Sequence, residues 1–148
     1  MGTKRVGLAR VEALIENLKR ELTLTTATLS AKGFQPVAQA VTAAASAADA
    51  VIDAGTQFVS VTSGNGDHIV QLPAPVVGNM IYIHVGANGC ELRTSTPASI
   101  SINAGSGAGA ESALPANSLT ICICVSSTAW VAYEVASNGT VSATEAAA

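Results

Sequence analysis

The chain has 148 residues, 49% of them hydrophobic and only 11% charged, with a formal net charge of −3. An average soluble domain carries roughly 25% charged residues, so a monomer of this composition would have few charges to solvate its surface. We therefore expect much of that surface to be buried against other subunits or another protein. Nucleic acid is not an expected partner, because displacing its counterions needs a dense basic surface.

The charges are unevenly distributed along the chain. Residues 1–24 hold five basic and three acidic side chains, whereas the rest of the chain holds two basic and seven acidic ones. We interpret the basic segment as one that docks on an acidic protein surface. No signal-peptide core and no uninterrupted transmembrane run is apparent, so no membrane is expected. Three cysteines, an odd number, do not suggest a disulfide framework and favour production in a reducing cytoplasm.

Residues 1–30 are predicted to form an amphipathic association helix. Leu, Glu, Lys and Arg are frequent there and favour helix, and the apolar residues recur in steps of three and four, as in a coiled-coil seam. The predicted interface residues are Leu8, Val11, Ile15, Leu18 and Leu22 of the seam, with Arg10, Lys19 and Arg20 beside them. So short a helix is marginal alone, which favours self-association or docking on a partner. The alternative is that the helix folds back on the following β domain.

Residues 31–55 are predicted to be an Ala-rich linker. Eight of the thirteen residues between positions 38 and 50 are alanine. Alanine favours helix, but a stripe of such small side chains buries little area. A second helix and an extended arm laid along another subunit are both open.

From residue 56 onward the pattern is β. Short runs rich in Val, Ile, Thr and Tyr are separated by turns containing Gly, Asn and Pro. Six strands are expected, at residues 57–61, 68–72, 80–85, 99–103, 119–125 and 129–135. The fold class is therefore mainly β with an N-terminal α-helix: a small antiparallel β-sandwich or barrel-like domain over residues 56–141, then a flexible C-terminal tail at residues 142–148.

The strand at residues 119–125 is apolar on both faces. Odd-numbered residues from Leu119 to Val125 share one face, and Thr120, Cys122 and Cys124 share the other. Burial on both sides in so small a domain again indicates contact with other subunits.

Residues that could bind a metal or carry thiol chemistry are scattered. His68 and His84 lie on separate predicted strands without another ligand at a regular spacing, and Cys122 and Cys124 lack the second pair of a zinc site. We interpret these two cysteines as packed thiols. Cys90 lies beside a Gly turn, a position compatible with exposure, but nothing near it marks an activated thiolate.

No motif predicts catalysis. The Gly-rich loop at residues 105–109 lacks the Lys-Ser/Thr of a phosphate-binding loop, and Ser63, Asp67 and His68 occupy one loop without a nucleophile elbow. Trp130 and Tyr133 offer a sugar-stacking surface, but a single Trp near a strand end is typical of a core residue. The sequence thus predicts a non-enzymatic protein with no catalytic residue, no metal and no cofactor.

Several short motifs follow one another in a characteristic order. They are HIVQLPAP at 68–75, Gly78, ELR at 91–93, the Gly-rich loop, ESALPAN at 111–117 and STAW at 127–130, preceded by MGTKRVGLAR at 1–10. In this order, residues 1–30 and 56–141 resemble virion structural proteins of tailed bacteriophages, including marine phages, in particular capsid decoration (cement) proteins and fibre segments.

This resemblance implies a role. The protein would be a homotrimer on the capsid surface of the virion, made in the host bacterial cytoplasm and bound to the major capsid protein. Binding only the assembled shell would stabilise it by mass action, with avidity from many symmetric copies. The alternative is a head or tail fibre or other appendage with a receptor- or glycan-binding β tip. A soluble carbohydrate-binding module is a third hypothesis, which the sparse aromatic residues fit poorly.

Overall fold

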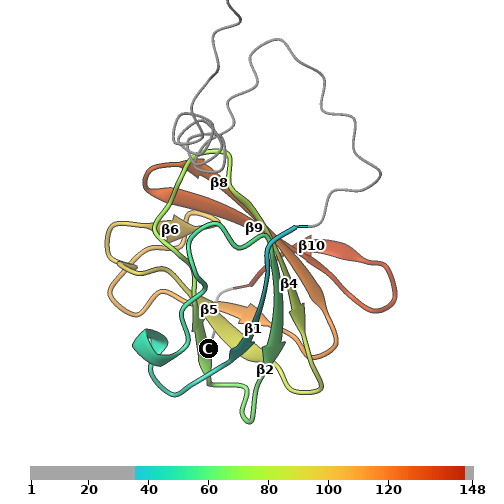
Figure 1. Ribbon diagram of the computed structural model, residues 1–148. Coiled ribbons are helices and arrows are strands. Elements are labelled where there is room, and N and C mark those ends of the chain that lie inside the picture. Colours follow the sequence, from blue (N-terminus) through green and yellow to red (C-terminus); the bar gives the residue numbers. More distant parts are fainter. Residues whose placement is uncertain (1–35, 146–148) are drawn as a thin grey trace, which may run out of the picture. The chain divides into compact units, whose positions relative to one another are not determined.

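The computed structural model describes residues 36–145, and the predicted association helix lies outside this part (Figure 1). The described residues form ten strands and one short 3-10 helix, η1. In chain order the elements are β1 Ala38–Thr42, η1 Ala47–Asp49, β2 Phe58–Thr62, β3 Ile69–Gln71, β4 Met80–Val85, β5 Cys90–Arg93, β6 Ser101–Ile102, β7 Ser112–Leu114, β8 Leu119–Ser126, β9 Ala129–Val135 and β10 Val141–Ala143. The prediction of a mainly β domain is confirmed.

The strands form two sheets with one apolar core. The larger sheet has the order β1-β2-β4-β8-β9-β10, with β6 beside β9, and the smaller has the order β3-β5-β7 (Figure 1). From β2 to β8, consecutive strands alternate between the sheets, so the chain winds around the core that both sheets share. Neither sheet closes into a barrel.

The sheets are mixed, which corrects the prediction of an antiparallel domain. β2 runs parallel to both β1 and β4, β3 runs parallel to β5, and β6 runs parallel to β9. The crossings from β2 through β3 to β4, and from β3 through β4 to β5, produce the parallel pairs β2–β4 and β3–β5. The pairs β4–β8 and β5–β7 are antiparallel. Only the tight connections from β8 to β9 and from β9 to β10 make antiparallel hairpins.

Each of the six predicted strands overlaps an observed one, and those at residues 80–85 and 129–135 have the predicted bounds. The structure adds β1, β5, β7 and β10. Two of these, β5 and β7, are short and half polar, and each buries two alternating side chains. Sequences of three or four residues with that composition do not stand out from loops.

The described part of the predicted Ala-rich linker belongs to the β domain. β1 pairs in parallel with β2, and Ala44 and Val51 form bridges to β3 of the other sheet. Val41 and Ile52 are buried in the core. The segment is thus mostly extended, but along its own domain, and its small side chains let the chain pass closely from one sheet to the other.

The C-terminal boundary also differs from the prediction, because residues 142–145 are part of the β domain. Two of these residues lie in β10. Beyond it, the Thr144 N–H donates to the Ala132 carbonyl at 3.1 Å, and the Ala113 N–H donates to the Glu145 carbonyl at 2.9 Å. Thr144 therefore contacts β9 of the larger sheet, and Glu145 contacts β7 of the smaller one.

Asn103 joins the segment at Thr144 to β9 of the larger sheet. Its side-chain amide donates to the Ala132 carbonyl at 2.8 Å and to the Thr144 hydroxyl at 3.0 Å, and its side-chain oxygen accepts the Ala132 N–H at 2.9 Å. Asn103 and Ala104 both have positive φ, 49° and 66°, in a tight turn closed by hydrogen bonds between Ile102 and Gly105. Asn tolerates this left-handed conformation better than most residues.

The core is filled mainly by aliphatic side chains, with Trp130 as its largest member. Trp130 is 1% exposed, which confirms its interpretation as a core residue and removes it from any sugar-stacking surface. β8 contributes its face of small residues, Thr120, Cys122 and Cys124, all buried. Its larger aliphatic residues therefore point away from the core.

Candidate functional site

The face of the larger sheet that is turned away from the core, here called the outer face, is apolar. Strand registers place Phe58, Tyr82, Ile121, Tyr133 and Ala143 in one row across five strands. Rows on either side add Met80 and Val131 with Ile123, and Val135 and Val141 with Leu119. The outer face thus joins residues from strands that are far apart in the sequence but adjacent in the sheet (Figure 1).

Many of these side chains are open to solvent. Phe58 is 39% exposed, Tyr82 37% and Tyr133 44%, and Val141 at the end of the sheet reaches 62%. The β8 residues between them, Leu119, Ile121 and Ile123, are half-buried by their neighbours. A soluble domain usually places polar residues on the solvent side of a sheet, so this face is atypical.

The outer face carries no Asp, Glu, Lys or Arg at any strand position. Its polar members are small hydroxyl residues, such as Ser60 and Thr62, and His84. Glu134, the one acidic residue in the strands of this sheet, alternates with Tyr133 and Val135 and so belongs to the opposite face of β9. The described domain as a whole has seven acidic residues and one basic one, Arg93, so its charge lies elsewhere.

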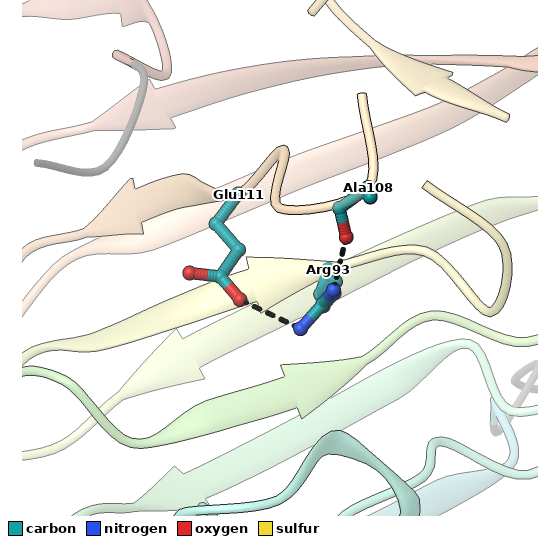
Figure 2. Close-up of polar contacts among 3 residues, drawn as sticks. All are labelled: Arg93, Ala108 and Glu111. Carbon is teal, nitrogen blue, oxygen red and sulfur yellow. Dashed lines mark hydrogen bonds and ion pairs between the residues drawn. The ribbon is translucent and has the colours of Figure 1, made fainter. Parts of the chain in front are cut away.

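The smaller sheet holds the domain's main charged cluster. Arg93 of β5 forms an ion pair with Glu111, with 3.1 Å between Nη1 and Oε1, and also donates to the Ala108 carbonyl (Figure 2). The two side chains are only 27% and 17% exposed. Because Ala108 lies in the Gly-rich loop, Arg93 fastens that loop to β5. This contact favours a structural role for the loop.

Glu91 belongs to the same cluster. Partial burial, a hydrogen bond and charge repulsion from Glu111, and the charge of Asp67 raise the pKa of Glu91 to about 7, although Arg93 acts in the opposite direction. The Glu91 carboxyl therefore changes its protonation near neutral pH. An open groove of about 440 Å³ lies beside Arg93 and Gln71, but the Arg93 donors are directed to Glu111 and Ala108.

The sulfur and imidazole side chains do not assemble into a site. Cys122 and Cys124 are packed thiols, as predicted, whereas Cys90 is 2% exposed and the expectation that it could be exposed is wrong. Burial raises the pKa of both Cys90 and Cys122 to about 12, so neither is a nucleophile near neutral pH. Within residues 36–145, no group of three His, Cys, Asp or Glu side chains could hold a metal ion.

The loop residues considered for a triad hydrogen-bond elsewhere. The Ser63 hydroxyl donates to the Asn65 carbonyl at 2.6 Å, and His68 Nδ1 lies 3.2 Å from the Ala43 carbonyl. A serine nucleophile would need a hydrogen bond from its hydroxyl to the base, whereas the Ser63 hydroxyl donates to a backbone carbonyl. The loop thus has the bonding of a structural turn.

The eight interface residues predicted from the N-terminal pattern, from Leu8 to Leu22, lie outside the described residues. The outer face was not predicted as a surface. One part of it could be found in the sequence, namely the two-sided apolar pattern of residues 119–125. The other members come from strands whose adjacency depends on the crossings between sheets.

Comparisons with protein families, with curated proteins and with solved structures gave no match for this chain. The candidate site is therefore defined by strand register and side-chain exposure alone. Among the described residues, no helix has the length and apolar character needed to cross a membrane.

Proposed function

We propose that the protein is a virion structural protein, a capsid decoration protein that binds the assembled major capsid shell as a homotrimer and stabilises it. The proposal starts from the resemblance of the motif order to that of tailed-phage virion proteins. The observation that carries it further is the outer face, a broad uncharged apolar surface on a small β domain. Such a surface suits a protein that works in contact with other subunits.

The charge distribution supports different roles for the β domain and for the N-terminal segment. Residues 36–145 carry seven acidic residues and one basic residue, whereas residues 1–24 have an excess of two basic ones. In the proposed mechanism the β domain supplies the body, and the basic N-terminal segment docks on an acidic surface of the shell. Each contact is weak, and repetition over many symmetric copies makes attachment stable.

The seam on the N-terminal segment provides the test. Ile15→Asp combined with Leu18→Asp should abolish saturable binding to purified capsid shells, while the β-type circular dichroism spectrum is retained. A double substitution on the opposite face of the predicted helix, Ala13→Asp with Asn17→Asp, adds the same two charges, is the control and should bind normally. Normal shell binding by the seam variant would contradict the proposed role of the segment.

Copy number separates this function from its alternative. A decoration protein is present in hundreds of copies per particle, whereas a head or tail fibre is present in a few to tens. Saturation of shells at a few copies would favour an appendage whose exposed β tip recognises a receptor or glycan. Tyr133 is the aromatic residue of the earlier sugar-binding hypothesis that is exposed, at 44%.

A further inference from the structure

We propose that the outer face of the larger sheet is the surface through which copies of this chain associate with one another. Packing of this face on the same face of another copy is two-fold and pairs copies, so the inference goes beyond the trimer contact of the proposed function, and it is tested without shells. Failure of the inference and failure of shell binding can therefore be told apart. The occupant of the face is a further copy of the same β domain.

The first argument is the sign of the charges. The described domain has an excess of six negative charges, counted as seven acidic residues less one basic residue, so two copies repel each other over most of their surfaces. The outer face bears none of these charged groups. It is therefore the broad surface on which a second copy can dock without like-charge repulsion, whereas a strongly basic partner would be attracted to the acidic surfaces instead.

The second argument is shape. Sheets pack face to face about 10 Å apart, with side chains from the two faces interdigitating. In the row of Phe58, Tyr82, Ile121 and Tyr133, the half-buried Ile121 lies between exposed aromatic rings. The exposed rings project above the half-buried Ile121 between them. The side chains of a second copy of the sheet can pack between these rings. Aromatic residues of this kind are also enriched at interface centres.

The third argument is area. Six strands spaced about 4.8 Å apart, each rising about 3.3 Å per residue, cover roughly 500 Å² per copy. Two such faces together reach roughly 1,000 Å², the lower limit for a biological interface and less than the roughly 1,200–2,000 Å² of stable ones, so the contact is a weak one. Contact through this face is thus sufficient for association that depends on concentration. The predicted N-terminal seam would strengthen it by raising the effective concentration of neighbouring domains.

The test substitutes the two exposed rings in the full-length chain. Tyr82→Glu combined with Tyr133→Glu places like charges face to face and should weaken association by about tenfold or more, measured as molar mass by light scattering over a dilution series. The matched control is Ala48→Glu combined with Val51→Glu, which adds the same charge at exposed positions of the segment beside β3 of the smaller sheet. The control should keep the mass of the unmodified protein.

A second measurement uses the unmodified protein, so it remains informative even if the tyrosine variant fails to fold. The chain has two tyrosines, and both lie on the outer face. Nitration of the unmodified protein should therefore slow as concentration is raised through the association range, with Trp130 fluorescence reporting that the core is intact. Unchanged mass in the tyrosine variant, or tyrosine reactivity independent of concentration in a protein that associates, would overturn the inference.

Discussion

The two sheets share one core but present different faces to their surroundings. The smaller sheet follows the usual alternation, since Cys90 and Leu92 of β5 point inward while Glu91 and Arg93 lie on the outside. The larger sheet departs from it at β8, where Thr120, Cys122 and Cys124 are buried and the larger aliphatic residues point outward. The difference teaches that burial against the core accounts for only part of the apolar pattern.

The departure at β8 bears on register. Shifting a strand by one residue moves every side chain to the opposite face, and such a shift would place Leu119, Ile121 and Ile123 in the core. The observed register instead fits small side chains opposite the bulk of Trp130, which pairs with Cys124 across the hairpin. Close packing around that ring thus favours the small residues inside, and the outward aliphatic side chains need another partner.

Truncation of a core side chain should have the largest effect on stability. Leu92 is fully buried, so Leu92→Ala should lower the free energy of unfolding by about 3 kcal/mol, through lost burial and the cavity that it leaves. Ile121→Ala on the outer face should cost about 1 kcal/mol or less in dilute protein, because that side chain is only half-buried. Urea denaturation measures both. Equal losses of stability would contradict the distinction between core positions and outer-face positions.

Removing the cation of the smaller sheet should have the next largest effect. Arg93→Gln should lower the free energy of unfolding by about 1–2 kcal/mol at pH 8, because Glu91 and Glu111 would then face each other without a cation. The loss should shrink at pH 5, where protonation relieves the repulsion. Denaturation at the two pH values checks this, and a loss independent of pH would show that Arg93 acts by packing alone.

The buried hydroxyl of β8 offers a stabilising substitution. Thr120 is fully buried, and its hydroxyl has no hydrogen-bond partner among the described residues. Thr120→Val keeps the shape and removes the unpaired polar group, so it should raise the free energy of unfolding by about 1 kcal/mol. Thr62→Val, at an exposed position of the outer face, is the control and should change stability by no more than about 0.5 kcal/mol. Destabilisation by Thr120→Val would point to a partner for the hydroxyl.

A smaller effect is expected from the titration of Glu91. Its pKa of about 7 in the folded protein exceeds the ordinary value of 4.5, so the folded state holds this proton more tightly than the unfolded state. The resulting stabilisation is complete below about pH 4.5 and is lost as the pH rises through about 7. Glu91→Gln should flatten the fall in melting temperature across this interval. Asp53→Asn, on an exposed turn, should leave the fall in place.

The strands were predictable where composition and alternation were both strong, as in β4 and β9. The mixed topology was not, because turn residues mark where a strand ends and do not say whether the chain folds back in one sheet or crosses to the other. β1 was hidden by the alanines of its segment, whose helix preference gave way to the pairing of β1 with β2 and to the bridges of Ala44 and Val51 with β3. Tertiary contacts decided that segment, and local propensity did not.

The candidate surface shows the same limit. Residues 119–125 revealed two apolar faces, and from this the sequence predicted burial by other subunits. Phe58, Tyr82 and Tyr133 each appear in the sequence as single aromatic residues on separate strands. They become one row only through the registers of β2, β4, β8 and β9.

The pairing of the last described residues has a consequence for synthesis. The hydrogen bond of Asn103 to Thr144 cannot form until Thr144, 41 residues later, has been synthesised. The contact of β7 with Glu145 likewise needs residue 145. A nascent chain therefore cannot add β10 to the larger sheet, or the Glu145 contact to β7, until residue 145 has left the ribosome. Chains that terminate early would lack these contacts, and we expect proteolysis to remove them before they compete for places in an assembly.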